Sequence, residues 1–183
     1  MDVVGVVLAA GAGRRAGGPK ALRVDAAGVS WVARAVARLE AAGCGSVLVV
    51  LGAGAEEARR LVPEHSQVVV ADDWAEGLSA SLRAALHAAS GDAALVTLVD
   101  LPDEPAAVGE RLLRDSPADP SVLARAAYRG RPGHPVLLGR AHWEPLSASL
   151  IGDSGARDYL VEHRAREVEC GDLFSGADRD GPG

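Results

Sequence analysis

A glycine-rich segment with basic side chains lies near the start of the chain, at residues 8–20 (LAAGAGRRAGGPK). Glycines allow tight turns in which successive backbone N–H groups face an anion, and the segment holds them at positions 11, 13, 17 and 18. Arg15 adds a planar guanidinium and Lys20 adds a compact ammonium charge, and both groups suit phosphate. A glycine cluster alone fits a plain surface turn equally well. The segment is therefore a candidate phosphate-binding loop, and the choice depends on the rest of the chain.

Two other phosphate-binding motifs fit this segment less well. Residues 11–16 match the dinucleotide-binding spacing Gly-x-Gly-x-x-Ala, but that fingerprint needs a helix to begin at once and an acidic residue to close the next strand. Here glycines and Pro19 follow, and the next expected strand ends at residues 51–52 (LG). The P-loop pattern needs Ser or Thr after its lysine, whereas Ala21 follows Lys20. A dinucleotide-binding oxidoreductase is therefore the less favoured alternative.

Alternating strands and helices must position this loop. Short apolar, β-branched runs predict buried strands at 3–8, 47–51 and 94–99. Further strands are expected at 67–70, 122–128, 135–138 and 166–168. Helices are expected at 31–42, 56–62, 79–89, 105–115 and 154–163, with Ser30, Ser79 and Ser154 as N-caps and a turn at 129–133. This order predicts one α/β domain over residues 1–183, a Rossmann-like three-layer sandwich with a mostly parallel central sheet.

Asp100 directly follows the fourth expected strand. In open parallel sheets, ligands bind beyond the carboxyl ends of the strands. The glycine-rich loop follows the first strand, so the loop and Asp100 are expected at the same edge of the sheet. This coincidence favours a binding role for both.

Composition excludes several classes of partner. The net charge of −6 gives no overall attraction for nucleic acid or an anionic membrane, so the charge of an anionic ligand must be met locally. Cys44 and Cys170 are too few and too far apart for a disulfide framework or a zinc site. The first ten residues lack the basic start of a signal peptide, and their apolar run is far shorter than the roughly 20 residues of a membrane span. A cytoplasmic location is expected.

The loop also resembles a known pattern, LAAGxxxRxGxxK, of the molybdenum cofactor cytidylyltransferase-like (molybdopterin nucleotidyltransferase) family. The resemblance continues in the same order along nearly the whole chain, at residues 77–83 (GLSASLR), 99–102 (VDLP), 133–137 (GHPVL) and 152–157 (GDSGAR). It implies a nucleotidyltransferase that transfers CMP from CTP to the phosphate of molybdopterin or molybdenum cofactor and releases pyrophosphate. The chain departs from the pattern at Leu101, where the family usually has Gln, and at Ala16, where it usually has Met.

The resemblance implies Mg²⁺ as the cofactor, held by Asp100 and by an aspartate near the C-terminus. Residues 176–182 (GADRDGP) resemble the D-x-D-x-P segment of the family, which makes Asp180 the expected second ligand. Mg²⁺ prefers one or two carboxylates together with substrate phosphates and water. Arg15, Lys20 and Asp100 are the expected catalytic residues, because such a reaction needs positioning and charge neutralisation more than covalent help.

The base is expected against the end of the first strand and residues 77–83. Family members that read LAAG, as residues 8–11 do, typically use CTP, and those that read LAGG typically use GTP. The expected nucleotide-binding residues are Leu8, Ala9, Ala10, Gly11, Gly13, Arg15, Lys20, Ser79, Ser81 and Leu82. The hydroxyls of Ser79 and Ser81 can contact cytosine, with helix capping and plain exposure as their respective alternatives.

The acceptor is expected near His134, Asp153 and Ser154. His134 precedes a strand and could contact the acceptor or simply occupy a turn. Asp153 and Ser154 could cap the following helix, whose N-terminus would face the acceptor phosphate or pterin.

Three alternatives and one set of partners follow. A guanylyltransferase acting on molybdopterin or another small phosphate monoester is the nearest alternative. A non-catalytic molybdenum-cofactor binding protein is another, although Lys20 and Asp100 argue against it, and the dinucleotide-binding oxidoreductase is the third. The expected partners are CTP or another NTP, a molybdopterin-type acceptor, and a molybdoenzyme or its chaperone that receives the product.

Overall fold

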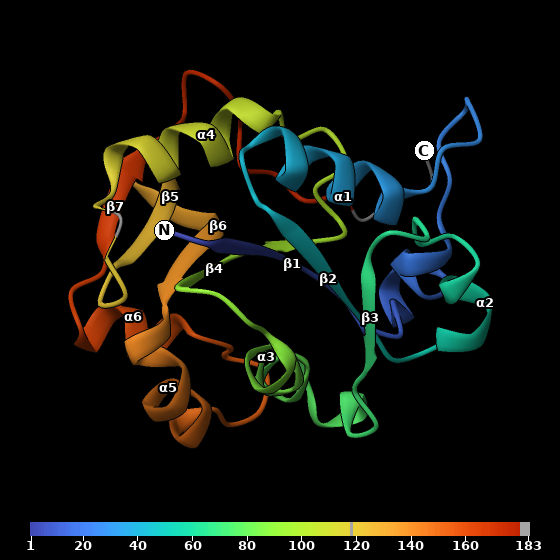
Figure 1. Ribbon diagram of the computed structural model, residues 1–183. Helices are drawn as coiled ribbons and strands as arrows, with labels where there is room; N and C mark the ends of the chain where they lie inside the picture. Colours follow the sequence, from blue (N-terminus) through green and yellow to red (C-terminus); the bar gives the residue numbers. More distant parts are fainter. Residues whose placement is uncertain (118, 180–183) are drawn as a thin grey trace.

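A seven-stranded sheet forms the centre of the molecule in the computed structural model, which describes residues 1–117 and 119–179 (Figure 1). The strands are β1 (Val3–Ala9), β2 (Ser46–Leu51), β3 (Gln67–Val70), β4 (Ala93–Leu98), β5 (Leu123–Tyr128), β6 (Arg131–Gly139) and β7 (Arg166–Glu169). Their order across the sheet is β3-β2-β1-β4-β6-β5-β7. All neighbouring pairs are parallel except the two that involve β6, so the expected mostly parallel sheet is confirmed.

Helices cover both faces of this sheet, which gives the expected three layers. They are α1 (Trp31–Ala41), α2 (Ala55–Arg59), α3 (Leu78–Ala88), α4 (Ala106–Asp115), α5 (Trp143–Ser149) and α6 (Arg157–Glu162). Four short 3₁₀ turns join them: η1 (Arg14–Ala16), η2 (Lys20–Leu22), η3 (Trp74–Glu76) and η4 (Arg140–His142). Figure 1 shows α1 and α4 on one face and α3, α5 and α6 on the other. None of the helices in the described ranges combines the length and apolar character needed to span a bilayer.

Strand β1 shows how the sequence builds these layers. All of its residues are buried, and successive side chains point to opposite faces. Val7 belongs to the apolar cluster under α1 and α4, whereas Val6 and Leu8 belong to the cluster under α3 and α5. Gly5 lets α1 come close, because a Cβ there would lie 3.0 Å from the side chain of Leu39. The two clusters fix the sheet between the helices.

The helix starts differ in part from the expected ones. Ser30 caps α1 as expected, and its Oγ accepts a hydrogen bond from the N–H of Ala33 at 3.0 Å. The capping roles of Ser79 and Ser154 were wrong, since Gly77 and Ala156 occupy the N-cap positions of α3 and α6. The expected turn at 129–133 is also shorter, because β6 already begins at Arg131.

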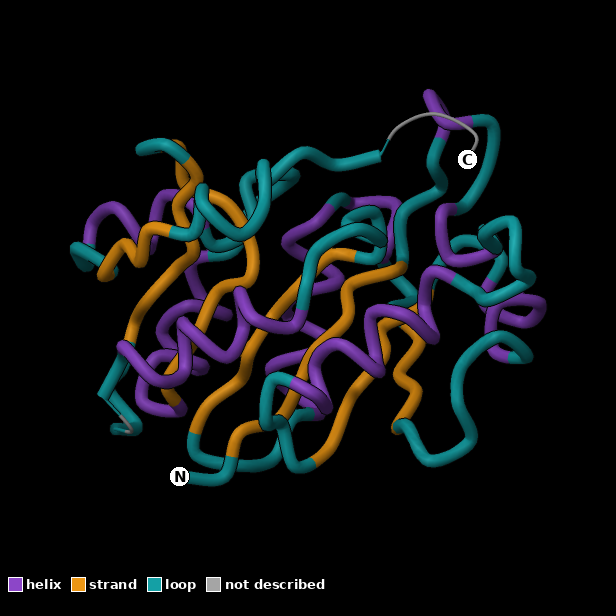
Figure 2. The backbone as a smooth tube through the Cα atoms, turned by 90° about the horizontal axis from the view of Figure 1, so that it is seen from above, coloured by secondary structure: helices purple, strands orange, loops and turns teal. Residues whose placement is uncertain are grey.

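The strands run side by side (Figure 2). Because all of them except β6 are parallel, their carboxyl ends, apart from that of β6, lie at the same edge of the sheet. Leu8 of β1 is paired with Leu98 of β4, and the N–H of Val99 donates to the carbonyl oxygen of Leu8 at 3.2 Å. The chain moves outward from β1 in one direction through β2 and β3, and then returns to place β4 on the other side. In sheets of this type, a crevice forms where the strand order reverses.

Candidate functional site

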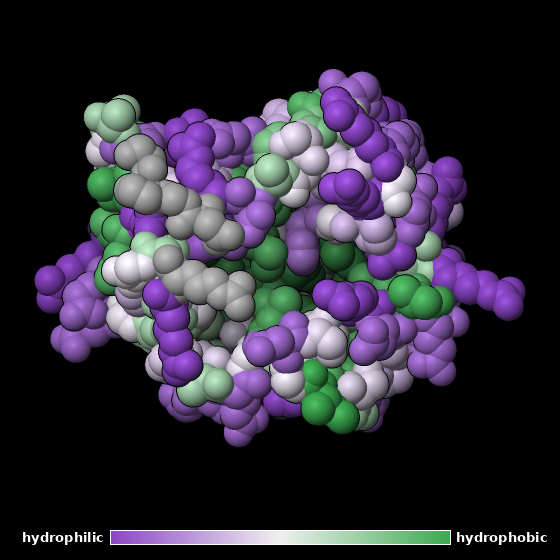
Figure 3. Space-filling view, turned by 180° about the vertical axis from the view of Figure 1, so that it is seen from behind, coloured by the Kyte–Doolittle hydropathy of each residue, from purple (hydrophilic) through white to green (hydrophobic). Residues whose placement is uncertain are grey.

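A cavity of about 870 Å³ opens where β1 and β4 end. Figure 3 shows a hollow on this side of the molecule, with hydrophobic residues at its floor and hydrophilic residues around its rim. The end of β1 and the glycine-rich loop line it with Leu8, Ala9, Ala10, Gly11, Gly13 and Lys20. Ser81, Asp100 and Asp153 line it from three other segments. The structure therefore brings together nine of the residues singled out from the sequence.

The glycine-rich loop closes on itself. The carbonyl oxygen of Gly13 accepts hydrogen bonds from the N–H groups of Ala16 and Gly18, at 2.9 and 3.1 Å. Gly13 has a φ of 57°, and a Cβ there would lie 1.9 Å from the carbonyl oxygen of Gly18. Gly11, by contrast, lies beside open space. The loop is thus tightly built on one side and free to receive a ligand on the other.

The loop enters the 3₁₀ turn η1 rather than a helix, and β2 ends at Leu51 without an acidic residue after it. Both observations agree with the sequence argument against a dinucleotide fingerprint.

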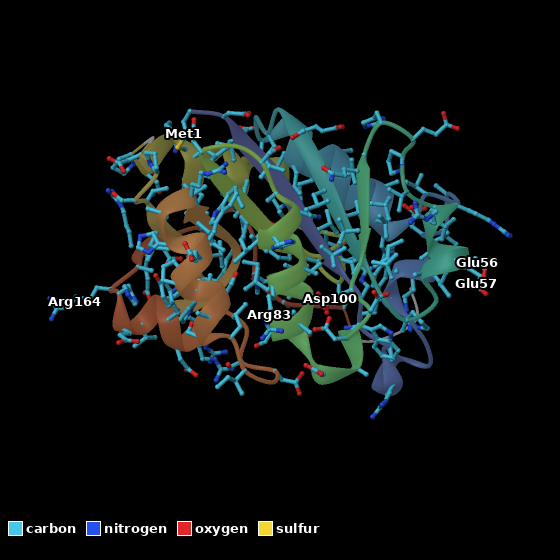
Figure 4. All side chains as sticks on the ribbon, turned by 60° about the horizontal axis from the view of Figure 1, so that its bottom comes forward. Met1, Glu56, Glu57, Arg83, Asp100 and Arg164 are labelled. Atoms are coloured by element: carbon cyan, nitrogen blue, oxygen red, sulfur yellow. The ribbon has the colours of Figure 1, made fainter. Side chains whose placement is uncertain are left out.

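Lys20 and Asp100 form an ion pair inside this cavity. Lys20 Nζ lies 2.9 Å from Asp100 Oδ2, and the two side chains are only 14% and 19% exposed. The other oxygen, Asp100 Oδ1, is buried and has no hydrogen-bond partner among the described residues. A buried carboxylate oxygen without a partner is costly unless something binds it. Figure 4 shows Asp100 at the carboxyl-end edge, away from Met1.

The C-terminal segment returns to the same place. Asp178 lines the cavity, and the N–H of Arg179 donates to the carbonyl oxygen of Asp100 at 2.9 Å. The guanidinium of Arg179 lies 2.6 Å from Asp103 in an exposed ion pair. A second carboxylate therefore lies in the cavity with Asp100. Asp180, the expected second metal ligand, lies outside the described residues, as does the side chain of Arg15.

A different loop closes the start of α3. Asp153 Oδ1 accepts a hydrogen bond from the N–H of Leu78 at 3.3 Å, and the carbonyl oxygen of Gly152 accepts one from the N–H of Ser79 at 3.0 Å. The expected role of Asp153 as a cap of the following helix was wrong, because its oxygen serves α3 instead. Gly77 has to be small here, since a Cβ would lie 2.2 Å from Asp153 Oδ1.

Several expected contact residues do not face the cavity. Leu82 is buried in the core below α3, and Ser79 is buried with its hydroxyl oxygen unpaired among the described residues. Ser154 donates a hydrogen bond to the carbonyl oxygen of Ile151 at 3.2 Å and does not line the cavity. Of the three expected serines, Ser79, Ser81 and Ser154, only Ser81 lines the cavity.

His134 lies close enough to Asp100 for the two charges to interact. Burial lowers the pKa of His134 to about 4, and the carboxylate of Asp100 offsets part of that effect. The ring is therefore neutral near pH 7. The backbone carbonyl oxygen of His134 accepts a hydrogen bond from the hydroxyl of Tyr128 at 2.5 Å. The ring of Tyr128 also packs edge-on against Phe174 of the C-terminal segment.

Four further residues with charged or aromatic side chains line the cavity and were not on the expected site list. They are Arg14, Trp74, Arg157 and Asp178. Arg157 ends the matched segment 152–157 and Asp178 begins the D-x-D segment, so both could have been found from the motifs themselves. Trp74 had no such signal, because its position depends on how the turn η3 folds over Gly52.

The donor set in the cavity fits a magnesium-type ion. Among residues 1–117 and 119–179, no three His, Cys, Asp or Glu side chains are grouped to hold a metal on their own. Mg²⁺ does not need such a group, because it is commonly held by one or two carboxylates together with substrate phosphates and water. Asp100, with its unpaired Oδ1, and Asp178 both line the cavity and are carboxylates of the kind that such an ion requires.

Fold and site together define a nucleotidyltransferase of the Rossmann-like type. Residues 5–168 match the family described as the MobA-like NTP transferase domain, and the chain belongs to this family. The resemblance to molybdopterin nucleotidyltransferases is thereby confirmed at the level of the family.

Three proteins illustrate the range of relatives. Nicotine blue oxidoreductase of Paenarthrobacter nicotinovorans is 35% identical over 194 residues, covering 97% of this chain and 92% of that protein. A nucleotidyl transferase from Methanothermobacter, Mth528, has 26% identity and a TM-score of 0.77, covering 98% of this chain and 92% of its own. The manganese complex of Rv0371c from Mycobacterium tuberculosis H37Rv shares the fold, with 24% identity, a TM-score of 0.75, and coverage of 93% and 89%.

Proposed function

We propose that this protein transfers the CMP unit of CTP to the phosphate of a molybdopterin-type acceptor. An oxygen of the acceptor phosphate attacks the α-phosphorus of CTP and forms a new P–O–P bond. The bond from the α-phosphorus to the leaving pyrophosphate breaks, and its electron pair goes to pyrophosphate. The attacking oxygen is already negative, so no strong general base is needed. The protein's task is to position the two substrates and neutralise their charge.

The ion pair of Lys20 and Asp100 is the observation that carries this proposal. It places a cation and a carboxylate with an unpaired oxygen beside the glycine-rich loop. The N–H groups of that loop would hold the β- and γ-phosphates, and Lys20 would stabilise charge on the transferring group. Asp100 would hold Mg²⁺, with Asp178 or Asp180 as the second carboxylate. When bound, the ion neutralises charge on the phosphates.

CTP is favoured over GTP by the sequence LAAG at residues 8–11, which line the cavity. The hydroxyl of Ser81 can donate to or accept from the base. On the acceptor side, Arg157 adds a guanidinium that suits a phosphate group. A molybdoenzyme or its chaperone would then receive the finished cofactor.

An oxidoreductase is the second candidate, because a relative that spans 97% of the chain is described as nicotine blue oxidoreductase. That activity would require a redox partner such as a nicotinamide dinucleotide. The loop geometry disfavours it, since only the three-residue 3₁₀ turn η1 follows Gly13 and no acidic residue directly follows β2.

Thermal stability with candidate nucleotides distinguishes the two functions. The protein would be melted with Mg²⁺ plus CTP, GTP, ATP or NAD⁺, and the series repeated on Lys20→Ala. Arg114→Ala is the matched control, because it removes an equal charge from an exposed pair with Asp115 on α4. A ligand that binds only the folded protein stabilises it by about 2.7 kcal/mol at roughly a hundredfold excess over Kd.

We expect a shift selective for CTP that Lys20→Ala loses and Arg114→Ala keeps. Turnover would then be assayed with molybdopterin, following release of pyrophosphate. A shift with GTP alone would retain the reaction class and change the base. A response to NAD⁺ alone would reject the transferase reading in favour of the oxidoreductase.

A further inference from the structure

A buried polar cluster lies next to the backbone that follows Asp100. Its members are Arg38 of α1, Thr97 of β4 and Glu104 of the loop after β4. Arg38 Nη2 lies 3.4 Å from both Thr97 Oγ1 and Glu104 Oε2. The hydroxyl of Thr97 donates to Glu104 Oε2 at 3.1 Å. The side chains of Arg38 and Glu104 are only 7% and 2% exposed.

This cluster contacts the backbone one residue after Asp100, at the carbonyl group of Leu101. Arg38 Nη1 donates to the carbonyl oxygen of Leu101 at 2.7 Å. The same oxygen accepts the N–H of Glu104 at 3.2 Å, which closes the loop into a turn. The preceding carbonyl oxygen, that of Asp100, accepts the N–H of Arg179. Two consecutive carbonyl groups are therefore fixed, and the side chain of Asp100 leaves the backbone at one of them.

Stability alone does not account for such a cluster. A buried ion pair is often no more stabilising than well-packed apolar side chains of similar volume. Here Arg38 Nε has no hydrogen-bond partner among the described residues, which adds to the cost. Burial also raises the pKa of Glu104 to about 7, although Arg38 and Thr97 lower it. A costly polar cluster that contacts one particular peptide group suits a positioning role.

We propose that Arg38 is a positioning residue for the divalent-cation site. Held in place by Thr97 and Glu104, it fixes the peptide of Leu101 and so orients the carboxylate of Asp100 before the metal arrives. Without the guanidinium of Arg38, the carboxylate of Asp100 is still present but can take other orientations, and the metal then binds more weakly. This inference rests on the proposed function only in taking Asp100 as a metal ligand.

Direct binding of Mn²⁺ to the full chain tests this role without relying on turnover. Free Mn²⁺ would be measured by electron paramagnetic resonance for the wild type, Arg38→Lys, Arg34→Lys and Asp100→Asn. A lysine ammonium keeps the charge of Arg38 but lacks the branched guanidinium that contacts Leu101, Thr97 and Glu104 at the same time. Arg34→Lys makes the same change one turn earlier on α1, at a 44% exposed side chain that pairs with Asp25.

We expect Arg38→Lys to weaken Mn²⁺ binding roughly tenfold, as changes behind a metal ligand commonly do. Arg34→Lys should bind within about twofold of the wild type because it lies in an exposed pair. In turnover assays, excess Mg²⁺ should restore most of the rate of Arg38→Lys, whereas a generally damaged protein would stay slow. If Arg38→Lys fails to fold, Thr97→Val removes one partner of the cluster at nearly equal volume and should shift Mn²⁺ binding in the same direction.

The two possible failures can be told apart. Unchanged Mn²⁺ binding in folded Arg38→Lys, with binding lost in Asp100→Asn, would overturn the positioning role alone. Unchanged binding in Asp100→Asn would overturn the metal assignment itself, and the positioning role with it.

Discussion

Arg179 and Asp100 are joined through their backbones, by a hydrogen bond of 2.9 Å from the N–H of one to the carbonyl oxygen of the other. This contact places the C-terminal segment beside the strand end that carries the proposed metal ligand. Because a backbone hydrogen bond does not depend on the side chain of Arg179, the arrangement should survive substitution of that residue. What the segment delivers to the cavity is the carboxylate of Asp178.

Asp178→Asn should therefore raise the Mg²⁺ concentration needed for half-maximal turnover by about tenfold, as loss of a metal-site partner commonly does. Arg179→Ala is the neighbouring control and should change it by less than about twofold, because it removes only an exposed ion pair. Initial rates at several Mg²⁺ concentrations would compare the two. Equal Mg²⁺ requirements for both variants would show that Asp178 takes no part in metal binding.

Glu104→Gln should flatten the dependence of stability on pH above pH 5. A carboxyl whose pKa is raised on folding holds its proton more tightly when folded. Its contribution is complete below its ordinary pKa of 4.5 and is lost as the pH rises through about 7. In the wild type, the free energy of unfolding contributed by Glu104 falls by about 3 kcal/mol between these two pH limits. Urea unfolding at pH 5, 6, 7 and 8 measures it, and equal slopes for wild type and variant would contradict the assignment.

His134→Gln should reduce the loss of folding stability at acidic pH. The pKa of His134 falls to about 4 on folding, so its contribution to stability is present above its ordinary pKa of 6.5 and is lost as the pH falls through 4. The wild type should accordingly lose more stability than the variant between pH 6.5 and 4. His87→Gln on α3 serves as a control with the same chemical change. If both variants follow the acid limb of the wild type, His134 is not the group responsible.

Gly13→Ala and Gly17→Ala separate two reasons for glycine in the loop. Both positions have positive φ, 57° and 79°, so each substitution costs about 1 kcal/mol of backbone strain. Only at Gly13 would the added Cβ also meet a backbone atom, the carbonyl oxygen of Gly18. We expect Gly13→Ala to reduce CTP affinity far more than Gly17→Ala, as measured by calorimetric titration. Similar losses of CTP affinity in the two variants would mean that the positive φ, and not the close contact with Gly18, is what CTP binding requires.

Periodicity and strand-end position were sufficient to predict the sheet, both helical layers and the edge of the sheet at which the cavity opens. The β-branched runs at 3–8 and 94–99 are signals of this kind, because a strand buried on both faces needs apolar side chains throughout. Helix α5 was missed, because its seven residues include Pro145 and give little periodic pattern.

Contacts between distant segments could not be predicted in the same way. Asp153 was expected to cap the helix that follows it in sequence, yet it caps α3, which begins 75 residues earlier. Likewise, nothing near Arg38 in the sequence indicates that its side chain reaches Leu101, 63 residues away. Local patterns determine which residues can cap or form ion pairs, whereas the packing of α1 and α3 on the sheet determines which partners they meet.

The cap that Asp153 provides for α3 also has a thermodynamic meaning. The carboxylate of Asp153 lies on the proposed acceptor side of the cavity. The helix that it caps, α3, carries Ser81 on the proposed nucleotide side. A ligand that competes for Asp153 would release the start of α3, whereas one that leaves the cap in place would find that helix already ordered. Occupancy of one half of the cavity should thus alter affinity in the other, and the effect must be equal in both directions. Titrating nucleotide with and without acceptor would measure that coupling.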